Sequence, residues 1–162
     1  METKRLGNIG ELKVLWKFAS LGIPVYIPFG DNEKADLIAE FGGKLNKIQV
    51  KTSEKFEDGK FIVSLDSSTV HNGVNYHHTY DSSEIDYFAL YNLNTDVLML
   101  IPIKELENRK AVTISIPFQT SRNQYKNLNY LDYTFEKIIL SAETLHEASL
   151  KEDEEKVQTT TT

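Results

Sequence analysis

The chain contains no cysteine, which excludes disulfide bonds and metal sites built from thiolates. No apolar run approaches the length that crosses a membrane, and the N-terminus lacks the hydrophobic segment of a secretory signal. With 162 residues, of which 40% are hydrophobic, the chain has the size and composition of one domain with an ordinary core. We therefore expect a soluble, cytoplasmic protein without a membrane partner.

An excess of positive charge is also absent. The formal net charge is −6, which argues mildly against a nucleic-acid partner. Residues 146–162 account for −3 of that charge, because five acidic residues stand there beside two lysines. Global charge governs solubility and association rather than what a local patch can bind. The charge balance therefore leaves a nucleic-acid partner open.

The first predicted element is a helix over residues 8–21. Asn8 suits the N-cap, Glu11 follows three residues later as in a capping box, and Gly22 suits the C-terminal stop. Apolar residues recur there at helical spacing. They predict a core face made of Leu12, Leu15, Trp16 and Ala19.

Further along the chain, apolar runs bounded by turn residues predict strands. These runs are 23–28, 35–41, 46–53, 61–65, 85–91, 97–101 and 112–116. A helical turn is expected at 103–108, a second helix at 132–149, and a disordered acidic tail at 151–162. Residues 66–83 are polar and predict a long loop. The order of helix, mixed sheet and helix indicates an α/β sandwich.

Three polar residues in the second and third predicted strands carry most of the functional information. Gln49 and Lys51 point to the same side of one strand, because side chains alternate. A hairpin through the intervening Gly-Gly turn would bring both residues beside Asp36. A carboxylate, an amide oxygen and a lysine at one place on a rigid sheet can hold a divalent metal ion and activate a water.

The motifs around these residues resemble a known family. The segments Gly7-Asn-Ile-Gly-Glu11, Gly30-Asp-Asn-Glu-Lys-Ala-Asp36 and Ile48-Gln-Val-Lys-Thr-Ser53 are similar to those of the PD-(D/E)XK nuclease superfamily. Tyr80 and Ile85-Asp-Tyr-Phe-Ala-Leu-Tyr91 resemble one branch of it, which includes homing endonucleases encoded within group I introns. The resemblance covers roughly residues 7–103, with weaker similarity through 118–130.

The resemblance implies a fold, a cofactor and roles for four residues. It implies a restriction-endonuclease-like core over residues 1–150, with a central mixed β-sheet flanked by helices. Mg²⁺ (or Mn²⁺) would be the cofactor, with Asp36 as its central ligand and the Val50 carbonyl completing its shell. Lys51 would position the attacking water and stabilise the charged phosphorane. A glutamate in the first helix often contributes to the metal site in this superfamily, a role that falls here on Glu11.

Each of these residues also has an alternative explanation that the sequence leaves open. Asp36 could be a turn residue, and Lys51 could be a surface lysine. Gln49 departs from the usual acidic residue; its amide oxygen can ligate a metal without adding charge, or it could simply face water. Glu11 could be a helix cap instead of a metal ligand.

Two polar segments are candidates for DNA contact. The first segment offers His71, Asn75, Tyr76, His77 and His78. The second, within residues 118–130, offers Arg122, Gln124 and Lys126. Either segment could instead be a solvated loop. A histidine-metal nuclease motif is disfavoured, because the strand-helix context and a second cluster of metal ligands are missing.

These expectations combine into a function. We expect a site-specific, Mg²⁺-dependent endonuclease that cuts double-stranded DNA, of the intron-homing type. A single small module reads few base pairs, so a long target implies a homodimer or tetramer. Segments 85–101 and 128–140 are candidate subunit interfaces. Alternatives are a restriction endonuclease, a Holliday-junction resolvase, or a DNA-binding protein whose catalytic site has decayed.

Overall fold

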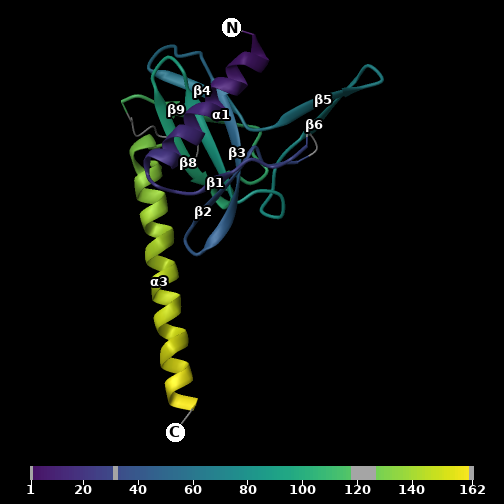
Figure 1. Cartoon of the computed structure of the whole chain (residues 1–162). Coiled ribbons are helices and arrows are strands. Elements are labelled where there is room, and N and C mark those ends of the chain that lie inside the picture. The colour runs from purple at the N-terminus through teal and green to yellow at the C-terminus, as the bar shows by residue number, and fades with distance from the viewer. Residues whose placement is uncertain (1, 31–32, 118–126, 161–162) are drawn as a thin grey trace.

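The computed structural model of the chain describes residues 2–30, 33–117 and 127–160 (Figure 1). Its elements are α1 (Thr3–Ser20), β1 (Val25–Tyr26), β2 (Leu37–Phe41), β3 (Lys44–Ser53), β4 (Lys60–Ser64), β5 (Ser67–His71), β6 (Val74–His78), β7 (Tyr87–Asn92), β8 (Val97–Pro102), α2 (Ile103–Leu106), β9 (Ala111–Ser115), β10 (Asn127–Leu128), the 3₁₀ turn η1 (Tyr130–Asp132) and α3 (Phe135–Thr160). Every strand predicted from the sequence is present, so the predicted succession of elements is largely confirmed. None of the helices among the described residues could span a membrane.

The centre of the fold is a five-stranded mixed sheet of order β1-β2-β3-β7-β8. β3 and β7 are parallel, whereas the other neighbouring strands are antiparallel. A smaller sheet, β10-β9-β4, packs nearby, and among the described residues β5 pairs only with β6. The predicted mixed α/β architecture is therefore confirmed.

Both faces of the central sheet are covered. On one face, Val14 and Phe18 of α1 and Phe135 of α3 pack with Ile48 and Ala89 of the sheet. On the other face, side chains of the smaller sheet and α2 pack against alternating residues of β7 and β8. Alternation along β3 assigns Ile48 and Val50 to the helix-covered face. Gln49 and Lys51 therefore project toward the opposite face.

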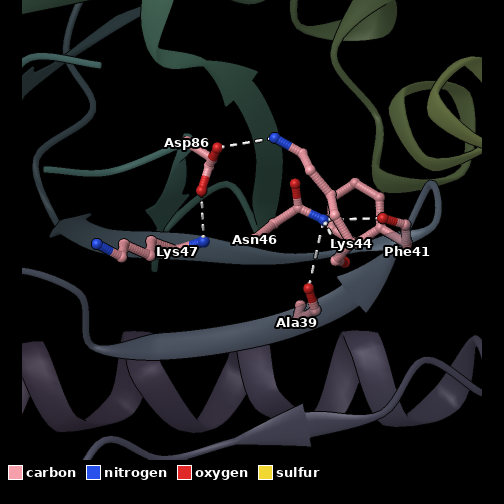
Figure 2. A network of polar contacts seen from close by, with 6 residues as sticks. All are labelled: Ala39, Phe41, Lys44, Asn46, Lys47 and Asp86. Atoms are coloured by element: carbon pink, nitrogen blue, oxygen red, sulfur yellow. Dashed lines mark hydrogen bonds and ion pairs between the residues drawn. The ribbon is translucent and has the colours of Figure 1, made fainter. Parts of the chain in front are cut away.

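A polar network fixes the hairpin of β2 and β3 (Figure 2). The fully buried Asn46 donates from Nδ2 to the Phe41 carbonyl at 2.9 Å and also reaches the carbonyls of Ala39 and Lys44. Asp86, which precedes β7, accepts from the Lys47 backbone N–H and from Lys44 Nζ, both at 2.9 Å. These bonds hold the hairpin in one register against the middle of the sheet.

The first helix differs from its prediction in start and in buried face. It begins at Thr3 after Glu2, and not after Asn8. Leu12 and Trp16, predicted as core residues, are 64% and 60% exposed. The buried face consists instead of Gly10, Val14 and Phe18. The physical reason is a close approach to β3: a Cβ at Gly10 would lie 1.8 Å from Thr52 Oγ1, so only glycine fits there.

Residues 66–83 are not the predicted long loop. Strands β5 and β6 pair within them and form a hairpin that extends away from the body (Figure 1). Its turn is Asn72-Gly73, in which both residues have positive φ. Asn-Gly is the strongest short signal for a two-residue hairpin turn, since the required backbone matches the strand twist.

The C-terminal helix also differs from its prediction. α3 continues to Thr160, so residues 151–160 are helical where the sequence predicted a disordered tail. Only the first half of α3 packs on the body, and the remainder projects outward as a single helix (Figure 1). Five of the six residues at 151–156 are Glu or Lys, which have high helix propensity, and this outweighs the charge pattern that suggested disorder.

Candidate active site

The β2–β3 hairpin brings Asp36 and Gln49 into direct contact. Asp36 lies one residue before the Leu37–Ile48 pair, so Gln49 is opposite it across the hairpin. Asp36 Oδ2 accepts two hydrogen bonds, from Gln49 Nε2 at 2.5 Å and from the Val50 backbone N–H at 2.7 Å. The predicted juxtaposition is therefore present. The carboxylate is held at one oxygen, which leaves Oδ1 for another partner.

Lys51 lies near Asp36 and Gln49, and we call the place where these three residues and Glu11 meet the corner. Lys51 also makes contacts of its own. Its Nζ donates to the backbone carbonyl of Asp66 at 3.0 Å and lies 5.0 Å from the centre of the Tyr80 ring. Lys51 is half-buried, and Tyr80 is only 6% exposed. These contacts do not suit a free surface lysine, the alternative that the sequence left open.

Glu11 reaches the corner from α1. Because the helix begins at Thr3, Glu11 is in its middle and cannot be the third residue of a capping box. The structural explanation offered by the sequence is therefore wrong. Gly10, the preceding residue, packs against Thr52 of β3, and this contact fixes the position of Glu11 along the β3 strand.

A cavity of about 320 Å³ connects the two carboxylates. Glu11 and Asp36 both line it, together with Asn8, Leu12, Leu15, Ile27 and Leu37. Gln49 and Lys51 are not among the residues that line this cavity. The two carboxylates thus share one cavity, and Gln49 is linked to it through its hydrogen bond to Asp36.

Burial perturbs the charged groups in this corner. Burial raises the pKa of the Asp36 carboxyl, against the opposing effects of the Val50 N–H, the Lys51 charge and Gln49. More than a third of Glu11 remains exposed, yet partial burial and then the Asp36 charge raise the pKa of its carboxyl. Burial lowers the pKa of the Lys51 ammonium, and Asp36 opposes this. Groups perturbed by desolvation and by each other are typical of functional sites.

The donor atoms present suit a hard divalent cation in part. Asp36 Oδ1, the Glu11 carboxylate and the Val50 carbonyl are oxygen donors, which Mg²⁺ prefers. Gln49 does not fit as it stands, because its Nε2 faces Asp36 and also donates to the Val50 carbonyl at 3.2 Å. Rotating the amide would present its oxygen instead. Within the described residues, no three His, Cys, Asp or Glu side chains form a metal-binding cluster.

Two of the histidines proposed for DNA contact, His77 and His78, have side-chain partners within the protein. His77 Nδ1 lies 2.8 Å from Asp66 Oδ2, and His78 Nε2 lies 2.9 Å from a Glu84 carboxylate oxygen. Tyr76 and Asn75 are exposed on β6. His71 occupies the end of β5, paired with Val74 across the turn.

Other residues divide into those outside the structure and those the sequence did not reveal. Arg122, Gln124 and Lys126 lie outside the described residues. Asp66 and Tyr80 touch Lys51 but were not predicted to belong to the site. They come from the two ends of the β5–β6 hairpin, and nothing in the spacing of the sequence places those ends beside β3.

Comparisons with known proteins bear on the family and the fold. A family model described as PD-(D/E)XK endonuclease matches residues 1–136. Among solved structures, the bacterial homing endonuclease I-Ssp6803I is similar, with a TM-score of 0.64 and 20% sequence identity over 82% of this chain and 88% of that chain. This likeness concerns the fold. No curated protein matches the chain.

Proposed function

The chain belongs to the PD-(D/E)XK endonuclease family, and we propose that it is a site-specific, Mg²⁺-dependent DNA endonuclease of the intron-homing type. That it is a DNA-cleaving nuclease follows from the family. The observation that carries the finer proposal is the contact of Asp36 with Gln49, on the strand that also bears Lys51. Similarity in fold to a bacterial homing endonuclease supports the intron-homing type.

In the proposed reaction, Asp36 and Glu11 form the acidic side of the site, and the Val50 carbonyl lies next to them. These oxygens would hold Mg²⁺ (or Mn²⁺), which neutralises charge on the phosphate and lowers the pKa of a bound water. Lys51 places a positive charge where negative charge develops on the phosphorus oxygens. Its partial burial strengthens this interaction, because water screens it less.

Gln49 distinguishes this site from one with three acidic residues. As an amide it adds no negative charge, so metal affinity depends more on Glu11 and Asp36. In the arrangement described here, Gln49 holds Asp36 by donating a hydrogen bond to it. Its role is therefore to orient the carboxylate, and it becomes a ligand only if the amide rotates.

DNA recognition and assembly belong to the same proposal. The exposed β5–β6 hairpin, with Asn75 and Tyr76, would contact DNA beside the site. A double-strand cut at a long target requires a dimer or tetramer. The predicted interface at 85–101 is wrong for β7 and β8, whose residues are largely buried in the core of their own chain. Light scattering with and without DNA tests the assembly.

Cleavage of plasmids carrying a randomised insert tests the proposal against its alternatives. We expect double-strand cuts at a defined sequence in Mg²⁺ and none in EDTA. Cutting of four-way junctions without sequence preference would favour a Holliday-junction resolvase. DNA binding without cleavage in either Mg²⁺ or Mn²⁺ would favour a decayed nuclease. A restriction endonuclease would cut at a short sequence that recurs throughout the plasmid.

A further inference from the structure

We propose that the two ends of the β5–β6 hairpin clasp Lys51, and that Tyr80 is the positioning residue that directs the lysine ammonium into the active site. This inference rests on the proposed function, since it assigns Lys51 a role in cleavage. It adds a residue that acts through Lys51 and a physical link between the hairpin and the site.

The clasp consists of two contacts to one ammonium. The backbone carbonyl of Asp66, directly before β5, accepts a hydrogen bond from Lys51 Nζ at 3.0 Å. The ring of Tyr80, which follows β6, lies 5.0 Å from the same nitrogen. A cation over an aromatic face is attracted by the negative face of the ring, and more strongly where water is displaced. Both contacts orient a side chain that otherwise has many rotamers.

Each half of the clasp is itself fixed. The Asp66 carboxylate accepts from Ser64 Oγ at 2.6 Å and lies 2.8 Å from His77 Nδ1 on β6. The Tyr80 ring packs edge-on against Phe88 of β7, with 5.6 Å between centroids, and its hydroxyl is hydrogen-bonded to Ser67 of β5. The ring and the carbonyl therefore cannot move far without disturbing both strands of the hairpin.

This arrangement explains how the half-buried Lys51 side chain keeps one orientation. Asp36 and Asp66 both attract the Lys51 charge, but the hydrogen bonds that Asp36 accepts come from Gln49 and Val50. Without the clasp, Lys51 could swing toward Asp36 and neutralise the carboxylate that the proposed reaction needs. The clasp keeps the two charges apart, so both remain available to the substrate.

Removal of the ring tests the role of Tyr80. In Tyr80→Leu we expect the single-turnover cleavage rate in Mg²⁺ to fall roughly 10- to 30-fold, as loss of a desolvated cation–π contact predicts. The DNA dissociation constant should stay unchanged. Tyr80→Phe, which loses the hydroxyl bond but keeps the ring face, should restore the rate. Tyr80→Leu cleaving at the wild-type rate, or losing affinity while its rate holds, would overturn the proposal.

A matched control is available on the neighbouring strand. Tyr91 is 5% exposed and has Lys13 Nζ at 5.6 Å from its ring, outside the active site. Tyr91→Leu removes an equivalent contact, so its stability should fall while the cleavage rate of the folded protein holds. An equal loss of rate in Tyr91→Leu would mean that Tyr80 matters only for folding, and this would also overturn the proposal.

A spectroscopic measurement separates this inference from the proposed function. In ¹³C-lysine-labelled protein, the Cε–Hε signal of Lys51, identified by its loss in Lys51→Arg, should be shifted upfield by the Tyr80 ring. The shift should persist in Tyr80→Phe and disappear in Tyr80→Leu. An unshifted signal in the wild type would refute the clasp even if DNA is cut. A shifted signal in a protein that cuts no DNA would refute the proposed function and retain the contact.

Discussion

The corner, which is the candidate active site around Asp36, and the β5–β6 hairpin differ in how their polar groups are held. In the corner, Asp36 and Gln49 bond to each other inside a hairpin that a buried asparagine and an aspartate fasten to the sheet. The β5–β6 hairpin pairs with no third strand among the described residues, and its β6 side chains are mostly exposed. The corner holds its polar groups at fixed distances from one another, whereas the β5–β6 hairpin leaves its polar groups accessible to a partner.

This difference matches what cleavage and recognition require. Catalysis depends on reacting groups held within fractions of an ångström, which needs supporting contacts on every side. Contact with DNA requires polar and aromatic groups that reach outward. Substitutions in the corner should therefore change rate or stability, whereas substitutions on the hairpin strands should change affinity. The four predictions below test this division.

The largest effect is expected for Asp36→Asn. Loss of the charge should weaken the metal site by several kcal/mol, so the cleavage rate should fall roughly a thousandfold. The fold should persist, because the asparagine oxygen can still accept from the Val50 N–H. The melting temperature should hold or rise, because the raised pKa of Asp36 shows that its burial as an anion is unfavourable. Plasmid cleavage and thermal denaturation measure both quantities.

The matched control for this substitution is Glu40→Gln, on β2, the strand that Asp36 directly precedes. Glu40 is exposed and accepts a hydrogen bond from the Tyr26 hydroxyl at 3.1 Å. We expect it to cleave as the wild type does. Wild-type cleavage by Asp36→Asn, or an equal loss in Glu40→Gln, would remove Asp36 from the site.

A pair of glycines on α1 tests the support of the corner. Gly10→Ala should destabilise the protein by about 1–3 kcal/mol, because the new Cβ would lie 1.8 Å from Thr52 Oγ1. Gly7→Ala has nothing within 4 Å of its Cβ and should stabilise the helix by up to about 1 kcal/mol. Urea denaturation measures both. Equal stability of the two variants would contradict the close packing of α1 on β3.

Gln49→Glu tests the role of Gln49, the residue that replaces the acidic residue usual in this family. Without metal, a carboxylate would replace the amide that donates to Asp36, and this should cost about 1–3 kcal/mol of stability. Mg²⁺ should restore the stability, and half-maximal cleavage should need less Mg²⁺ than in the wild type. Thermal denaturation across a Mg²⁺ titration measures this. An inactive but folded variant would show that the donating amide itself is required.

The smallest effect is expected at Tyr76, on the hairpin. Tyr76 is 57% exposed, so Tyr76→Ala should leave the melting temperature unchanged. DNA affinity should fall by about 1 kcal/mol, roughly fivefold to tenfold, while the rate at saturating protein holds. This is the reverse of the pattern expected for Tyr80→Leu. Gel-shift titration and single-turnover cleavage distinguish the two, and a slower rate with intact affinity would contradict the division of roles.

Much of the fold and the centre of the site could be predicted from the sequence. Strands can be predicted from local sequence, because alternating or apolar runs between turn residues indicate them. The Gly-Gly turn makes β2 and β3 a hairpin, and the alternation of side chains then places Gln49 opposite Asp36. Two residues close in sequence to a turn need no knowledge of the remaining chain.

The predictions that differ from the structure concern elements whose conformation depends on contacts between residues far apart in the sequence. The buried face of α1 follows from Gly10 meeting Thr52, and only the spacing of Gly10, Val14 and Phe18 hinted at it. Asn72-Gly73 is typical of a β5–β6 hairpin turn, but the two strands are polar and lack the apolar alternation that would have predicted them. The contact of Tyr80 with Lys51 joins elements far apart in the chain, so no local pattern could reveal it.

The central claim is that Asp36, with Gln49 and Lys51, forms a metal-dependent site that cuts DNA at a defined sequence. The most direct test is sequencing of the ends produced when the wild type and Asp36→Asn act on a randomised duplex library with Mg²⁺ or EDTA. We predict that one sequence motif is enriched at the cut ends only for the wild type in Mg²⁺. Cut ends that persist in EDTA or in Asp36→Asn would contradict the account.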